Sequence, residues 1–86
     1  MPEITIYTTS ACPYCHAAKA LLKRKGAAFC EIDVTGDPAA RTALAKKAAG
    51  SSTVPQIWIG ATHVGGCDDL HALDRAGRLD PMLAPA

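Results

Sequence analysis

The chain has 86 residues, of which 49% are hydrophobic and 20% are charged, and its formal net charge is +1. This is the balance of an ordinary globular protein, and we expect one domain over residues 1–86 because a second domain would have too few residues for a core. The near-neutral charge gives no electrostatic reason to expect nucleic acid or an anionic membrane surface as a partner.

The expected secondary structure alternates between short strands and helices. In chain order the sequence predicts a strand at 4–8, a helix at 13–25, a strand at 28–34, a helix from 38 to about 47, strands at 56–59 and 62–64, and a helix from 68 to about 76. The order β-α-β-α-β-β-α predicts an α/β fold in which a four-stranded mixed sheet is flanked by three helices. The first two strands are expected to be parallel, and the last two to form an antiparallel hairpin.

The N-terminus and the apolar runs are typical of a cytoplasmic protein. The first residues lack the basic and apolar stretches of a secretory signal, and the apolar run at 54–59 is too short to cross a bilayer. In a reducing compartment, the four cysteines are expected to be catalytic, metal-binding or buried thiols rather than a disulfide scaffold.

A Cys-x-x-Cys motif, Cys12 to Cys15, lies between the first strand and the first helix. Unpaired amides at a helix start stabilise a thiolate, and cysteines there have pKa values lowered to roughly 3.5–7.5. Cys15 continues with Ala18 and Leu22 in the spacing of a core-facing stripe. The motif therefore predicts a thiol–disulfide oxidoreductase in which Cys12 is the exposed nucleophile, Cys15 is the buried resolving thiol, and the two form a redox-active disulfide.

Other cysteines and charged residues have simpler interpretations. A zinc site is not expected, because the chain has no second C-x-x-C or H-x₃₋₅-H pair. Cys30 is predicted to be a small buried residue in a strand, and Phe29 and Trp58 to be core residues. Lys19 is either a source of positive field for the thiolates or a solvated surface lysine.

Three motifs in one order resemble the small bacterial dithiol glutaredoxins: Cys12-Pro13-Tyr14-Cys15, Thr53-Val54-Pro55 and Gly65-Gly66-Cys67-Asp68-Asp69. The resemblance implies a thioredoxin-like fold, no tightly bound cofactor and glutathione as co-substrate. It also implies a monomer that reduces protein disulfides and protein–glutathione mixed disulfides.

The resemblance also assigns the glutathione-binding residues. In the family the proline of Thr53-Val54-Pro55 is cis, and the Val54 backbone pairs with the glutathione cysteine. The γ-glutamyl carboxylate lies at Gly66 and Cys67, with Asp68 near the ammonium group. The implied set is Tyr14, Thr53, Val54, Pro55, Gly66, Cys67 and Asp68. Two alternatives stay open: Cys67 is either structural or oxidisable, and Asp69 either helps to bind glutathione or only stabilises the helix start.

Two positions depart from the family pattern. Relatives often have a lysine where this chain has Thr9, and many have a basic residue where Ser51 and Ser52 stand. Those cations usually contact the glycine carboxylate of glutathione, so we expect weaker glutathione affinity unless Arg41 or Lys47 substitutes.

The sequence leaves two other functions open. The first is a glutaredoxin-like redoxin that is reduced by thioredoxin reductase, which the absence of a lysine at Thr9 favours. The second is an iron–sulfur carrier that uses Cys12 from two subunits with glutathione. Relatives with that task commonly have C-G-F-S at the site, and Pro13 argues against it by stiffening the turn.

Overall fold

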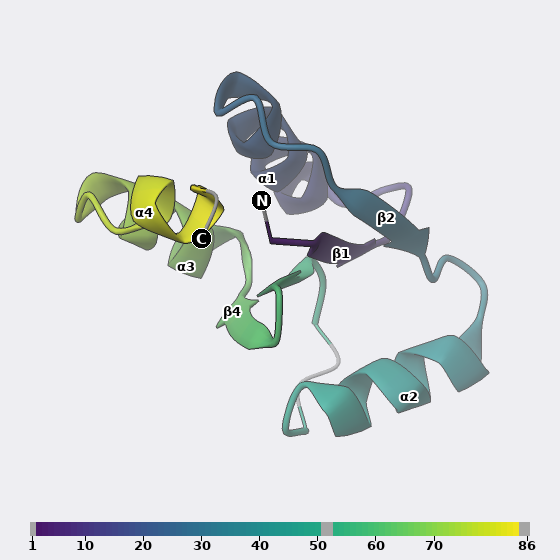
Figure 1. Cartoon of the computed structure of the whole chain (residues 1–86). Coiled ribbons are helices and arrows are strands. Elements are labelled where there is room, and N and C mark those ends of the chain that lie inside the picture. The colour runs from purple at the N-terminus through teal and green to yellow at the C-terminus, as the bar shows by residue number, and fades with distance from the viewer. Residues whose placement is uncertain (1, 51–52, 85–86) are drawn as a thin grey trace.

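The computed structural model describes residues 2–50 and 53–84. Its elements are β1 (Ile4–Thr8), α1 (Pro13–Arg24), β2 (Cys30–Asp33), α2 (Pro38–Lys47), β3 (Gln56–Ile59), β4 (Thr62–Gly65), α3 (Cys67–Arg75) and α4 (Leu79–Leu83). The predicted order β-α-β-α-β-β-α is confirmed. The three predicted helices are present, and a fourth short helix, α4, which the sequence did not predict, follows them (Figure 1). A five-residue helix that contains Pro81 and has no capping side chain leaves no periodic pattern to detect.

The four strands form one mixed sheet in the order β2-β1-β3-β4. β1 pairs with β2 in parallel, whereas β1 with β3 and β3 with β4 are antiparallel, as the sequence predicted for the first and last pairs. Because β1 is an inner strand, its C-terminal end lies between its two neighbouring strands, β2 and β3. The loop at residues 9–12 then leads directly into α1, so the fold itself places the start of α1 beside the end of β1.

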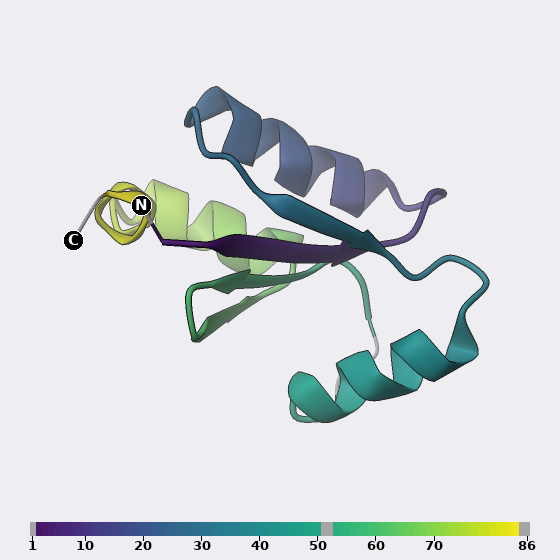
Figure 2. The same cartoon turned by 45° about the vertical axis from the view of Figure 1, so that its right-hand side comes forward.

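Helices cover both faces of the sheet. Helices α1, α3 and α4 lie on one side, and α2 lies on the other (Figure 2). The core under α1, α3 and α4 includes Ile6, Leu22 and Leu70. The smaller core under α2 is built on Leu44 and Trp58, so the prediction that Trp58 is a core residue is confirmed.

Strand β2 lies at the edge of the sheet, and all four of its residues are exposed. The prediction that Cys30 is buried was therefore wrong. The β-prone residues around Cys30 correctly predicted a strand. A pattern of residue types along one strand, however, does not show whether that strand lies at the edge of the sheet. Phe29, just before the strand, is partly buried against the main core.

The ends of α1 and α2 carry residues that are typical of helix starts and ends. Pro13 occupies the first position of α1, where its missing N–H leaves no hydrogen bond unmade, and Lys23 and Arg24 lie in the last turn. Asp37 caps α2 by accepting a hydrogen bond from the Ala40 amide at 3.0 Å, as predicted for an N-cap.

Over the part of the chain that the structure describes, no helix combines the length and apolar character needed to cross a bilayer.

Candidate functional site

Cys12 and Cys15 lie where the sequence predicts, at the start of α1. Cys12 is the N-cap residue and is partly exposed, whereas Cys15 is 0% exposed. Both are free thiols in this structure. The two sulfurs therefore differ in access: a disulfide in solution reaches Cys12 first, and Cys15 only through Cys12.

The surroundings also separate the two thiols by their pKa values. Burial alone raises the pKa of Cys12, but hydrogen bonds to its sulfur from the Cys15 amide, the Cys15 thiol and the Tyr14 amide outweigh burial. The pKa of Cys12 therefore lies below its ordinary value of 9.0. Burial raises the pKa of Cys15 to about 11, against the opposing effects of the Thr9 amide and the Lys19 charge. Of the two thiols, Cys12 is therefore the one that ionises more readily.

The Val54–Pro55 segment lies against Cys12. The peptide bond between these residues is cis, as the family resemblance implied. The Cys12 thiol donates a hydrogen bond to the Val54 carbonyl oxygen, with 3.6 Å between sulfur and oxygen. A backbone segment that leads into β3 is thereby held next to the reactive sulfur, although the two lie 42 positions apart.

A cavity of about 400 Å³ opens next to this contact. It is lined by every residue that the resemblance assigned to glutathione, namely Tyr14, Thr53, Val54, Pro55, Gly66, Cys67 and Asp68. Tyr14 is 62% exposed, so its ring stands at the mouth rather than in the core. Three separate segments, from α1, from the loop before β3 and from the start of α3, thus meet around one space.

Four further residues line the cavity that the sequence analysis did not assign to it: Gln56, His63, Gly65 and Asp69. The His63 Nε2 and Gln56 Oε1 atoms are 2.7 Å apart, and Gln56 Nε2 donates to Thr53 Oγ1 at 3.0 Å. His63 also stacks on Trp58. Gln56 and His63 together form a polar wall of the cavity. The sequence signal for this wall was the predicted hairpin of 56–59 and 62–64, which places the two residues on neighbouring strands.

The start of α3 depends on Asp69 and two glycines. Asp69 Oδ2 accepts a hydrogen bond from the Gly66 amide at 2.9 Å and so caps the helix. Gly65 has a φ of +111°, and a Cβ at this position would collide with the Asp69 carboxylate. Asp69 therefore stabilises the helix start, which was one of its two open interpretations. The neighbouring Asp68 also lines the cavity and is not part of this cap.

Cys67 is a buried thiol with a local partner. Its sulfur lies 3.3 Å from His71 Nδ1, which also lies 2.9 Å from the Cys67 carbonyl oxygen. Burial raises the pKa of Cys67, and the charges of Asp68 and Cys12 add to this effect. These features favour the structural interpretation of Cys67. Within the described residues, no three His, Cys, Asp or Glu side chains group closely enough to hold a metal ion.

The two candidates for the missing cations lie elsewhere. The Lys47 ammonium lies over the rings of Tyr7 and Trp58, at 5.5 and 4.6 Å from their centroids. Arg41 lines a different cavity, at the start of α2. Ser51 and Ser52 fall outside the described residues.

The chain is similar to known glutaredoxins over nearly its whole length. Residues 4–64 match the family model for glutaredoxin. A glutaredoxin of Pseudomonas aeruginosa is 66% identical over 84 residues, which cover 98% of this chain and 99% of that relative. The solution structure of a glutaredoxin from Brucella melitensis is 53% identical and covers 96% of this chain and 89% of that one, with a TM-score of 0.85. A crystal structure of a buckwheat glutaredoxin–glutathione complex is 34% identical and covers 93% of this chain and 74% of that one, also with a TM-score of 0.85. The predicted thioredoxin-like fold is confirmed by these structures.

Proposed function

The chain belongs to the glutaredoxin family and is a thiol–disulfide oxidoreductase, and from this premise we propose that it uses glutathione through Cys12, Cys15 and the cavity beside them. Its substrates are protein disulfides and protein–glutathione mixed disulfides. The observation that supports this proposal best is the meeting of Cys12, the Val54 carbonyl and the cavity in one place.

The first reaction removes glutathione from a protein. The Cys12 thiolate attacks the glutathione sulfur of the mixed disulfide, and the protein leaves as a thiolate that takes up a proton from water. A second glutathione thiolate then attacks the glutathione sulfur on Cys12. This step releases oxidised glutathione and restores the Cys12 thiolate. Cys15 takes no part, so the proposal predicts that Cys12 alone suffices here.

The second reaction reduces a disulfide within a protein. Cys12 attacks one sulfur and forms a mixed disulfide with the substrate, whose other sulfur leaves as a thiolate. Cys15, ionised as it reacts, attacks the Cys12 sulfur; the substrate leaves as a dithiol and a Cys12–Cys15 disulfide remains. Two glutathione molecules then reduce that disulfide and become one oxidised glutathione.

Glutathione fits the cavity by its chemistry. The backbone of Val54 offers polar groups to a short peptide, as a strand edge does. The positive end of the helix dipole at the start of α3, beside Gly66 and Cys67, suits a carboxylate, and the Asp68 side chain suits an ammonium group. The crystallised buckwheat relative was solved as a glutathione complex, which supports the same ligand here.

The proposal extends to the setting of the reaction. We place the protein in the cytoplasm, where glutathione keeps thiols reduced, as a monomer of one domain whose partners are glutathione and disulfide-bearing or glutathionylated proteins. No tightly bound cofactor is needed for either reaction, because every electron pair moves between sulfur atoms.

A coupled assay tests the source of electrons. A glutathionylated model peptide is supplied with glutathione and glutathione reductase in one arm, and with thioredoxin reductase and no glutathione in the other. The proposal expects turnover in the glutathione arm, with a high Michaelis constant for glutathione if no cation replaces those missing at Thr9, Ser51 and Ser52. Turnover only in the thioredoxin reductase arm would contradict it and would favour the redoxin alternative.

A further inference from the structure

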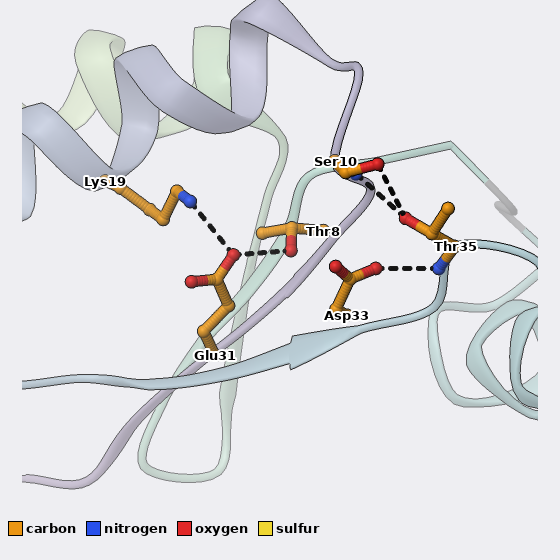
Figure 3. A network of polar contacts seen from close by, with 6 residues as sticks. All are labelled: Thr8, Ser10, Lys19, Glu31, Asp33 and Thr35. Carbon is orange, nitrogen blue, oxygen red and sulfur yellow. Dashed lines mark hydrogen bonds and ion pairs between the residues drawn. The ribbon is translucent and has the colours of Figure 1, made fainter.

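A polar network joins the back of the Cys12–Cys15 site to the edge strand β2. Glu31 Oε2 accepts two hydrogen bonds, one from Thr8 Oγ1 at 2.7 Å and one from Lys19 Nζ at 2.9 Å (Figure 3). Thr8 is 1% exposed at the end of β1, so its hydroxyl requires this partner. A single carboxylate oxygen on β2 thus holds a residue of β1 and a residue of α1.

Both residues that hydrogen-bond to Glu31 are connected with Cys15. Lys19 lies one helical turn after Cys15, on the same face of α1, and its charge favours the Cys15 thiolate. Thr8 precedes Thr9, whose backbone amide hydrogen-bonds to the Cys15 sulfur. One oxygen atom of Glu31 therefore bonds Lys19 directly and bonds Thr8, the residue next to the Thr9 amide (Figure 3).

We propose that Glu31 is a positioning residue for the resolving step, and that it holds Lys19 and the Thr8–Thr9 segment where they assist Cys15 in attacking a mixed disulfide on Cys12. The inference rests on the proposed function, in which that attack completes the reduction of a protein disulfide. It also decides between the two interpretations of Lys19 in favour of the positive field.

The chemistry explains why this step needs help. Cys15 has to lose its proton before its sulfur attacks Cys12, and the proton goes to water or to the departing substrate thiolate. Burial opposes this ionisation. In the mixed disulfide Cys12 carries no charge, so its repulsion is absent. Three influences on the pKa of Cys15 then remain: burial raises it, and the Lys19 charge and the Thr9 amide lower it.

Neither Lys19 nor Glu31 is a hydrogen-bond partner of Cys12. The groups that lower the pKa of Cys12 are its hydrogen-bond partners in the first turn of α1, and Lys19 and Glu31 are not among them. The removal of glutathione from proteins needs only Cys12. The inference therefore separates two activities of one enzyme: loss of the network slows the reduction of protein disulfides and leaves the removal of glutathione unchanged.

Single-turnover kinetics test this directly. The reduced protein is mixed with oxidised glutathione and quenched with acid, and mass spectrometry follows the conversion of glutathionylated Cys12 into the Cys12–Cys15 disulfide. We expect K19M to slow this conversion by about two- to fivefold at neutral pH, because the cation is partly exposed and its effect is screened. E31A is expected to slow it in the same direction.

Two variants control for charge and for helix structure. K19R keeps a cation within reach of Glu31 and is expected to restore most of the rate. K23M removes an exposed cation from the last turn of the same helix and is expected to leave the rate unchanged. Multiple-turnover removal of glutathione from a peptide is measured for every variant, and the inference expects wild-type values throughout.

Several results would overturn the inference. E31A resolving as fast as the wild type, or faster, would show that Glu31 only masks the Lys19 charge. K19R as slow as K19M would show that the cation itself does not act. An equal loss in both activities would indicate a general structural role. If the wild type formed no Cys12–Cys15 disulfide at all, the proposed function would fail instead, so the two failures are distinguishable.

Discussion

The Cys12 sulfur and the Val54 carbonyl oxygen lie 3.6 Å apart and join the start of α1 to the segment that leads into β3. This contact is made by the thiol, because only the protonated sulfur has a hydrogen to donate. When Cys12 ionises, the carbonyl loses its donor and becomes free to accept a hydrogen bond from an incoming peptide amide. In the function that we propose, the same two atoms thus connect the protonation state of Cys12 with the binding of its substrate.

The first prediction separates the roles of the two cysteines. C15S is expected to keep most of the activity that removes glutathione from a peptide, and to lose the reduction of an intramolecular protein disulfide. C12S is expected to lose both activities, because the remaining thiol is buried and has a raised pKa. Both are measured in glutathione-coupled assays. An active C12S protein would show that the assignment of nucleophile and resolving thiol is wrong.

The second prediction contrasts two neighbouring carboxylates on α3. D68N changes a residue that lines the cavity, so we expect the Michaelis constant for a glutathionylated peptide to rise about two- to tenfold while stability stays near that of the wild type. D69A removes the helix cap and is expected to lower the free energy of unfolding by about 0.5–2 kcal/mol. Kinetics and urea denaturation of both variants give the result. A matching loss of affinity in both would contradict separate roles.

The third prediction concerns stability at alkaline pH. Because folding raises the pKa of Cys15 to about 11 from 9.0, the folded state keeps a proton that the unfolded chain loses. The stabilising effect is complete below pH 9 and is lost as the pH rises towards 11. Under reducing conditions the wild type should therefore lose more stability over this range than C15A does. Parallel losses in urea denaturation at several pH values would show that Cys15 is not held protonated.

The fourth prediction tests α4, the helix that the sequence analysis did not detect. Leu79 is 0% exposed and belongs to the main core, so L79A is expected to lower the free energy of unfolding by about 2–4 kcal/mol. The exposed Ile32 on the edge strand serves as control, and I32A should lose about 1 kcal/mol or less. Equal losses would mean that α4 does not complete the core.

The parts of the fold that the sequence predicted are those with local signals. Proline at the first helical position, glycine after the last and alternating apolar residues gave the order of strands and helices. The roles predicted for Cys12 and Cys15 came from the helix start at Cys12 and from the core-facing stripe that Cys15 forms with Ala18 and Leu22. The residues around the cavity came from motifs that lie in three separate segments, and the family resemblance, rather than residue spacing, brought them together.

The features that the sequence did not predict depend on contacts between distant segments. The exposure of Cys30 follows from the position of β2 at the sheet edge, which its own residues do not reveal. The link between Lys19 and Glu31 joins a helix to a strand. The polar wall formed by Gln56 and His63 depends on the pairing of β3 and β4. In each case the residue types were ordinary, and only the tertiary structure shows what surrounds them.

The central claim is that Cys12 is ionised more readily than an ordinary thiol, and its reaction rate with an alkylating reagent measures this most directly. The rate is followed across pH in the fully reduced wild type, and mass spectrometry assigns the modified cysteine at each pH. We predict that Cys12 reacts first and that its rate rises with a midpoint well below pH 9.0. A midpoint at or above 9.0, or first modification at another cysteine, would contradict the account.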